Sequence, residues 1–304
     1  MNSKTKAHIA VLVGNFFFGS AAVSIKHLTP QLMQPLALNV MRVGIALMLF
    51  WLLFLFKPGN ASIRKKDIPR FILCAAAGVS INQILFVQGA SLTSPIHTSL
   101  LSLATPIAIT IIAAWLLKEK ITINKVVGLA LGIGGAAVLI LVKNHADKES
   151  SVSGDLLIIS NAVSYAFYLV LAKPLMETYS PVHVIRWVFL FGAIMILPIG
   201  WKDFTQVNWN GFQWHHWFAL VFLVIGATFL SYLFMVFGIA KLGSSITGTY
   251  IYTQPIFATI VSMVLYGEKL SLIKFVAAAL IFGGVYLVNY KKKLSVSEGL
   301  ESLD

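Results

Sequence analysis

The chain has 304 residues, of which 58% are hydrophobic and only 11% are charged, with a formal net charge of +12 at pH 7. A soluble protein is about 25% charged, and one of this size cannot hide so much apolar surface in a core. The composition therefore excludes a soluble enzyme, a disordered protein and a secreted disulfide scaffold, and leaves a multi-spanning membrane protein.

Apolar stretches follow one another along the whole chain, and a membrane-spanning helix takes roughly 20 such residues. Turn-forming pairs such as Ser94-Pro95 and Ser180-Pro181 separate them. We predict an all-α integral membrane protein with a disordered cytoplasmic tail at 292–304. The ten predicted transmembrane helices are His8–Lys26, Pro35–Phe56, Arg70–Ala90, Thr98–Leu117, Lys125–Val142, Gly154–Lys173, Val182–Gly200, Trp217–Ile239, Ser245–Tyr266 and Leu272–Tyr290.

The basic residues are distributed unevenly between the predicted loops. An even number of spans puts both termini on one side, and most Lys and Arg residues, including 64–66 and 291–293, then fall on that side. The other side holds Lys26, Lys143, Lys148, Lys202, Lys269 and Lys274. Because cytoplasmic loops carry the excess of Lys and Arg, we expect a multi-pass protein of the plasma (inner) membrane with both termini cytoplasmic. No nucleic-acid partner is expected, because the basic residues form no single face with aromatic platforms.

The second half of the chain repeats the first. Gly89 to Thr122 align without gaps on Gly238 to Ser271, so that Pro106 matches Pro255 and Glu119 matches Glu268. The copies, residues 8–143 and 154–291, each hold five predicted spans, and an odd number inverts the second copy in the membrane. Inverted repeats around a central cavity are typical of transporters that work by alternating access.

Three motifs carry a resemblance to a known family. They are Gly14-Asn15-Phe16-Phe17-Phe18-Gly19 followed by Lys26, then Met41-Arg42, then Lys118-Glu119-Lys120, repeated as Gly267-Glu268-Lys269. Over residues 8–291 the chain resembles an EamA-type permease of the drug/metabolite transporter superfamily. The resemblance implies two EamA-type five-helix repeats, a cavity lined by helices one, three and four of each half, and movement of small metabolites, commonly by efflux.

Polar residues inside the spans are the candidate substrate site, because they must face protein or a cavity rather than lipid. Pro106 and Pro255 fall within spans four and nine and free backbone carbonyls there. The predicted cavity residues are Asn15, Asn82, Gln83, Ser99, Ser102, Thr105, Asn161, Tyr165, Tyr168, Tyr232, Tyr250, Thr253 and Gln254. Amides, hydroxyls and aromatic rings suit a neutral or zwitterionic solute. The alternative for these hydroxyls is hydrogen bonding between helices.

More than one role is possible for several of the charged residues. Arg42 is a possible contact for a substrate anion, or it snorkels or caps backbone carbonyls. Glu119 and Glu268, with Pro106 and Pro255, are candidate gate or helix-break residues, and the alternative for the two acids is a solvated helix end. No Asp or Glu lies in the middle of a span, which argues against a proton antiporter built on a buried acid and makes uniport the hypothesis.

Two further patterns favour packing over chemistry. Gly128, Gly132, Gly134 and Gly135, with Gly283 and Gly284, predict close helix packing rather than dinucleotide binding. His215-His216 lies beside Trp214 and Trp217 and reads as an interfacial pair rather than a metal site, since no acid or cysteine is near it in the sequence.

The sequence thus predicts a permease, working as an exporter, for small neutral or zwitterionic metabolites such as amino acids. Its expected partners are that solute and the lipid bilayer, and it is expected to be a monomer or homodimer. No cofactor, metal or catalytic residue is expected. The alternatives are an integral-membrane enzyme, which should show clustered acids or histidines at one face, and a non-transporting membrane subunit.

Overall fold

The computed structural model describes residues 2–56, 62–116, 123–141, 150–242, 247 and 250–289. The regular structure of these residues is helical throughout, without a strand. Eight helices are long and apolar enough to cross a membrane, and two shorter apolar helices span Tyr250–Tyr266 and Leu272–Leu287. These ten segments correspond in order to the ten predicted spans, and the predicted tail lies outside the described residues.

Several spans are compound helices. The elements are α1 (Ser3–Leu28), α2 (Pro35–Phe56), η1 (Lys65–Asp67), α3 (Ile68–Ala75), η2 (Ala76–Ser80), α4 (Ile81–Leu92), α5 (Pro95–Ser102), α6 (Ala104–Leu116), α7 (Ile123–Leu141), α8 (Val152–Thr178), α9 (Pro181–Thr205), η3 (Trp209–Gly211), α10 (Trp214–Val221), η4 (Phe222–Leu230), α11 (Ser231–Leu242), η5 (Tyr250–Thr253), α13 (Gln254–Tyr266) and α14 (Leu272–Asn289). The third span runs from η1 through α4, and the eighth from α10 through α11. The fourth is interrupted at Leu103 between α5 and α6.

Sequence-local chemistry sets the helix starts and one helix end. Ser94 and Ser180 precede Pro95 and Pro181, and each serine hydroxyl accepts the backbone N–H three residues later, at His97 and His183. A serine N-cap followed by proline at the first helical position is a favoured helix start. At the end of α13, Gly267 adopts a φ of 63°, the left-handed conformation that closes many helices.

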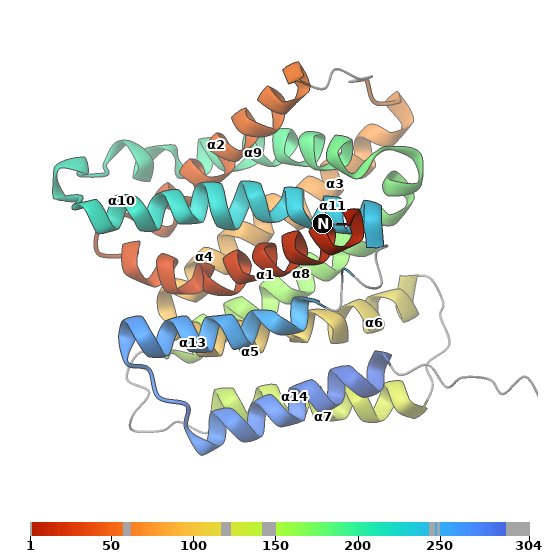
Figure 1. Ribbon diagram of the computed structural model, residues 1–304, viewed down its shortest axis with the longest axis vertical. Coiled ribbons are helices and arrows are strands. Elements are labelled where there is room, and N and C mark those ends of the chain that lie inside the picture. Colours follow the sequence, from red (N-terminus) through yellow and green to blue (C-terminus); the bar gives the residue numbers. More distant parts are fainter. Residues whose placement is uncertain are drawn as a thin grey trace, which may run out of the picture.

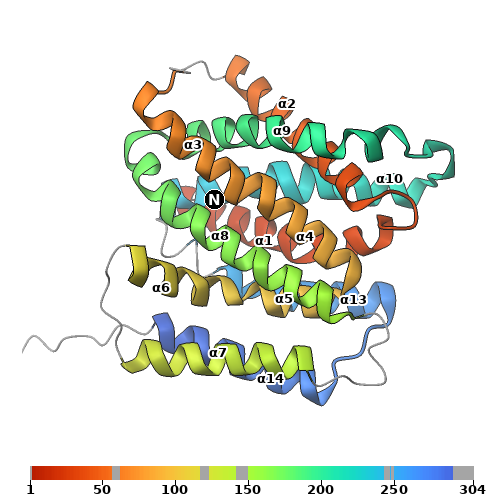
Figure 2. The same cartoon turned by 180° about the vertical axis from the view of Figure 1, so that it is seen from behind.

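The helices lie side by side in layers (Figures 1 and 2). One edge of the bundle is the pair α2 and α9, and the opposite edge is the pair α7 and α14. Between them, α1 packs against α11 and α13, while α8 packs against α4 and α6. The two central helices therefore have corresponding neighbours, since α1 contacts the eighth and ninth segments and α8 contacts the third and fourth.

The α7–α14 pair confirms the predicted glycine packing at Gly135 and Gly284, whereas a Cβ on Gly134 or Gly283 would meet nothing within 4 Å in the described part of the chain. A Cβ atom on Gly284 would lie 2.5 Å from the Gly128 carbonyl oxygen, and one on Gly135 would lie 2.9 Å from the Ala277 carbonyl oxygen. Glycine is needed here because the two backbones approach more closely than any side chain allows.

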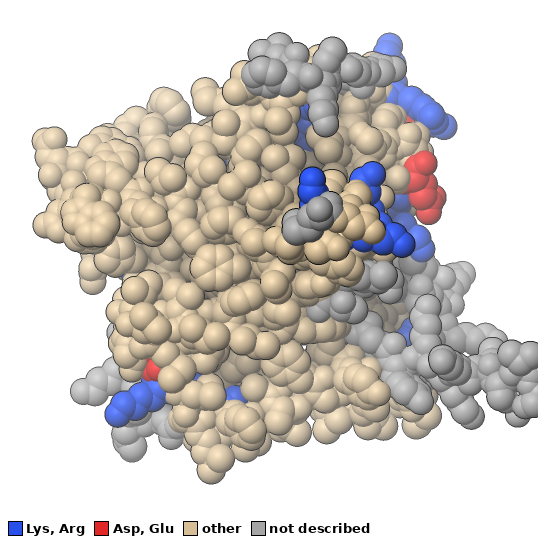
Figure 3. All heavy atoms as spheres, in the orientation of Figure 1, with Lys and Arg blue, Asp and Glu red and all other residues tan. Residues whose placement is uncertain are grey.

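Apolar side chains cover much of the outer surface, including Met48, Trp115, Val264 and Leu272. On the face drawn in Figure 3, charged residues gather at two opposite ends of the helices and uncharged surface fills the space between. This distribution is the one that a bilayer requires, because charge is costly at membrane depth and acceptable at the two interfaces.

Candidate substrate-binding site

The third and eighth spans contain π-helical segments at comparable places. The segment η2 interrupts the third span and η4 interrupts the eighth. The spacing that aligns Gly89 with Gly238 maps residues 76–80 onto 225–229, inside η4. π-helical turns leave backbone groups with altered partners and are frequent at functional sites.

Each π-helical segment carries a glycine against an aromatic ring of a central helix. A Cβ on Gly78 would lie 2.5 Å from the Tyr168 ring on α8, and one on Gly226 would lie 2.6 Å from the Phe17 ring on α1. The Phe17 ring of α1 therefore packs directly on the backbone of η4, and the Tyr168 ring of α8 on the backbone of η2. Sequence analysis did not find these segments, although the two glycines were a usable signal.

The predicted amides pair across the central helices. Asn82 Nδ2 donates to the Asn161 carbonyl oxygen at 3.3 Å, and Asn161 Nδ2 donates to the Asn82 carbonyl oxygen at 2.9 Å, which joins α4 to α8. Gln254 Nε2 donates to Asn15 Oδ1 at 2.8 Å, which joins α13 to α1. All of these amides lie inside the bundle, away from lipid. The structure thus brings four predicted cavity residues together as two pairs.

Three of the predicted tyrosines lie on α8 and α11. Tyr165 and Tyr168 stack with ring centroids 5.7 Å apart. Tyr232 of α11 meets Phe189 of α9 edge-on at 5.3 Å and Phe18 of α1 at 5.6 Å. Edge-to-face contacts of this kind hold aromatic rings in fixed orientations, so the rings form a rigid wall with hydroxyl tips.

Arg42 is buried in the bundle and does not snorkel. It is 3% exposed, and its Nε donates to Thr228 Oγ1 of η4 at 3.1 Å. Tyr232 is close enough to interact with it electrostatically. Within the described part of the chain Arg42 has no carboxylate partner, and its Nη1 is buried with no hydrogen-bond partner. A buried guanidinium without a counter-ion is costly.

Two buried amide oxygens, on α2 and α4, also lack partners among the described residues. Asn39 lies one helical turn before Arg42 on α2, and its Nδ2 donates to the Gln83 carbonyl oxygen at 3.2 Å. Asn39 Oδ1 and Gln83 Oε1 are buried and without a hydrogen-bond partner among the described residues. Sequence analysis included Gln83 but missed Asn39, whose i, i+3 spacing from Arg42 was the available signal.

The predicted hydroxyls of the fourth span mostly serve their own helix. Ser99 Oγ donates to the Ile96 carbonyl oxygen at 2.9 Å, and Ser102 Oγ donates to the Thr98 carbonyl oxygen at 2.7 Å. The helix break falls at Leu103, just before the half-buried Thr105 and Pro106. In the ninth span Pro255 stands in the first turn of α13, after η5. These prolines therefore follow the breaks and start the next helical segment.

Polar contacts also hold the N-terminal ends of the two central helices, α1 and α8. At the start of α1, His8 Nδ1 lies 2.7 Å from the hydroxyl oxygen of Tyr250 in η5. At the start of α8, Asp155 is 2% exposed, lies 3.2 Å from His97 Nδ1 of α5, and accepts a hydrogen bond from the Thr93 hydroxyl. Tyr250 and Thr253 lie in η5, directly before α13, and the Thr253 hydroxyl donates to the Tyr250 carbonyl oxygen at 2.6 Å. Sequence analysis did not anticipate that Asp155 is buried.

Glu268 is ion-paired. Its Oε1 lies 3.0 Å from Nζ of Lys274, which is 1% exposed, and its Oε2 accepts a hydrogen bond from Ser262. These contacts link the end of α13 to the first turn of α14, so Glu268 is not a solvated helix end. Its predicted counterpart Glu119 lies outside the described residues.

Two cavities are lined by residues other than the predicted cavity residues. One, of about 390 Å³, is lined by Ser62–Arg64, Thr178–Ser180 and His183 at the ends of α8 and α9. The other, of about 380 Å³, is an apolar groove along α3, η2 and α8.

Comparison with known proteins places the chain among transporters. The pattern of the EamA-like transporter family matches residues 5–141 and 152–290. The Bacillus subtilis protein "Uncharacterized transporter YetK" is 23% identical over 94% of this chain and 88% of its own length. A "Probable terminal-alkyne amino-acid exporter" of Streptantibioticus cattleyicolor is 27% identical over 74% of each chain. A solved crystal structure has the same fold, with a TM-score of 0.65 and 18% identity over 94% of this chain and 98% of that chain. The chain thus belongs to the EamA-like transporter family.

Proposed function

We propose that this chain exports small neutral or zwitterionic metabolites, such as amino acids, by alternating access. The observation that carries the substrate class is the buried guanidinium of Arg42, which lacks a carboxylate partner among the described residues and has an unpartnered Nη1. A guanidinium binds a carboxylate strongly, often through two parallel hydrogen bonds. The free Asn39 and Gln83 oxygens are acceptors that suit an ammonium group. A zwitterion supplies both groups.

The rest of the proposed site would hold the side chain of the solute. The stacked rings of Tyr165 and Tyr168 and the ring of Tyr232 offer apolar faces, while the amides of Asn15 and Asn161 keep polar groups within the bundle. The relative from S. cattleyicolor is named as an amino-acid exporter, which favours the same class of solute.

Alternating access is supported by the way the two proposed copies, 8–143 and 154–291, pack on each other. α1 packs on the eighth and ninth spans as α8 packs on the third and fourth. The spacing that relates Lys26 to Lys173 also relates His8 to Asp155, and these residues bond to the ninth and fourth spans. We propose that these two contacts are seals at opposite ends of the pathway, and that transport opens one while the other stays closed.

The remaining proposals concern orientation and coupling. We place both termini in the cytoplasm, where the predicted excess of Lys and Arg would lie. We propose uniport, since the acids in the described part of the spans lie at their ends. An imposed proton gradient across liposomes should therefore leave the amino-acid flux unchanged.

The test measures transport in liposomes that contain the purified protein, using labelled amino acids, their carboxamides and nucleosides. We expect saturable amino-acid transport, and we expect Arg42→Gln to reduce it at least tenfold while shifting preference toward the carboxamides. Arg186→Gln is the matched control, because Arg186 is also buried with one unpartnered nitrogen, Nε, but its guanidinium lies 4.6 Å from the Phe54 ring centroid. Equal losses in both variants with no change in preference, or no transport of any amino acid, would refute the proposal.

A further inference from the structure

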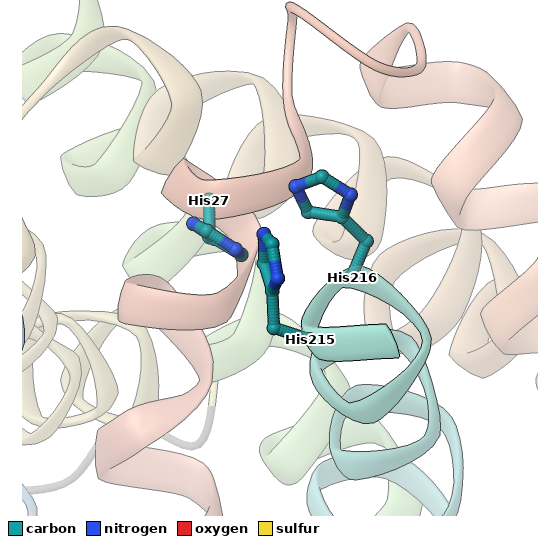
Figure 4. A group of neighbouring side chains, drawn as sticks. All are labelled: His27, His215 and His216. Atoms are coloured by element: carbon teal, nitrogen blue, oxygen red, sulfur yellow. The ribbon is translucent and has the colours of Figure 1, made fainter. Parts of the chain in front are cut away.

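Three histidines from two distant parts of the chain meet at one end of the bundle (Figure 4). His27 lies in the last turn of α1, and His215 and His216 lie in the first turn of α10. One ring nitrogen from each residue lies within 4.8 Å of the others, and all three side chains are half-buried. The sequence-based interpretation of His215-His216 as a simple interfacial pair did not include His27.

The geometry is close to that of a bound metal ion. A zinc ion holds imidazole nitrogens at about 2.0–2.1 Å, which puts two tetrahedral ligands about 3.3 Å apart. The three imidazole rings need only rotate slightly to close from 4.8 Å, since their ring centroids are already 4.0 to 5.3 Å apart. Figure 4 shows the three rings directed toward one shared space.

One hydrogen bond must change for His216 to bind through Nε2. Its Nδ1 accepts the backbone N–H of Gln213 at 3.0 Å, so the neutral ring carries its proton on Nε2. Coordination moves that proton to Nδ1 and gives up this bond. The loss is small because Gln213 is exposed, and its N–H can bond to water instead.

The surroundings of the cluster do not oppose a cation strongly. The adjacent Lys26 directs its amino group to the Ser91 carbonyl oxygen on α4, at 3.3 Å. Trp214 lies against His215 and Phe212 against His216, with ring centroids 5.8 and 6.0 Å apart, which places apolar rings beside the cluster. Three neutral imidazoles suit zinc, copper, nickel or cobalt, whereas magnesium and calcium require oxygen ligands.

We propose that His27, His215 and His216 form a binding site for one divalent transition-metal ion, such as Zn²⁺, with an open fourth position. The ion would join the last turn of α1 to the first turn of α10. This site is separate from the proposed substrate site, and the inference does not depend on the proposed function.

The test is metal binding by the full-length, tag-free protein in nanodiscs after chelator treatment. Titration calorimetry with Zn²⁺ should show one ion per chain, Co²⁺ should give a tetrahedral ligand-field spectrum, and Mg²⁺ should not bind. His27→Gln and His216→Gln should each weaken Zn²⁺ binding at least tenfold. His8→Gln, on the same α1 helix but outside the cluster, should bind as the wild type does.

A stability measurement separates lost binding from lost folding. Zn²⁺ should raise the melting temperature of the wild type and of His8→Gln, each compared with the same protein without metal, but not that of His27→Gln, which should still unfold cooperatively. No saturable binding in the wild type, or unchanged Zn²⁺ binding in His27→Gln, would overturn the proposal. So would equal affinity for Mg²⁺.

Discussion

The packing of α7 on α14 gives a sharp test, because two adjacent glycines differ in what they face. A methyl group on Gly284 would lie 2.5 Å from the Gly128 carbonyl oxygen and 2.6 Å from the Gly132 nitrogen. That is about 1 Å short of an ordinary van der Waals separation. Gly283→Ala is the matched control, since a methyl group there meets nothing within 4 Å among the described residues.

The two substitutions should change the free energy of unfolding in opposite directions. Overpacking a close interface costs about 1–3 kcal/mol, so Gly284→Ala should destabilise the protein by about that amount. Gly283→Ala should instead be neutral or stabilising by up to about 1 kcal/mol, because alanine loses less backbone entropy in a helix. We therefore expect a gap of about 1–4 kcal/mol between the two variants.

The assay is equilibrium unfolding in mixed micelles with increasing fractions of a denaturing detergent, followed by far-UV circular dichroism. The predicted order of midpoints is Gly284→Ala, then wild type, then Gly283→Ala or equal to wild type. If Gly284→Ala were as stable as Gly283→Ala, the backbones of α7 and α14 could not be as close as the structure has them.

Two further predictions concern polar contacts at helix ends. Asp155→Asn removes the charged partner of His97 and should lower the free energy of unfolding by about 1–3 kcal/mol, measured in the same assay; an unchanged midpoint would show that the pair adds no stability. Partial burial and the hydrogen bond to Asp67 raise the pKa of Tyr179, although the Arg64 backbone N–H acts in the opposite direction. Because the folded protein then favours the protonated phenol, this contribution is complete below about pH 10 and disappears as the pH rises through the raised pKa. The difference in tyrosinate absorbance between wild type and Tyr179→Phe should therefore titrate above pH 10, and titration at pH 10 or below would contradict it.

The sequence was sufficient for features that depend on local chemistry. α2 begins at Pro35 and ends at Phe56 as predicted, because an apolar run of this composition is helical and proline favours the first turn. The fourth and seventh spans were predicted to begin at Thr98 and Val182, whereas the helices begin at Pro95 and Pro181, directly after the capping serines of the predicted turns. The end of α9 was placed too early, at Gly200, because Trp201 to Thr205 continue the helix with mixed polarity.

Features that depend on pairing between distant segments were less accessible. Asp155 is buried because His97 and Thr93 of the preceding span meet it, and no local pattern around Asp155 indicates this. The π-helical segments change backbone hydrogen bonds without altering the apolar composition, so hydropathy does not reveal them. His27 joins the other two histidines because α1 runs antiparallel to the eighth span.

The proposed duplication repeats the packing of the helices more closely than it repeats their chemistry. Arg42 and Arg186 each keep one buried nitrogen without a hydrogen-bond partner among the described residues, Nη1 in Arg42 and Nε in Arg186, but the guanidinium of Arg186 lies over the rings of Trp51 and Phe54. The aromatic rings compensate the charge of Arg186 within the bundle, so it has less need of an anionic ligand. Alternating access requires that the helix packing be equivalent, because the same motion must open either end. A zwitterion, by contrast, has one carboxylate, and a single guanidinium is enough to bind it. The ring contacts of Arg186 therefore fit the proposed mechanism, in which equivalent helix packing moves a solute that needs one guanidinium.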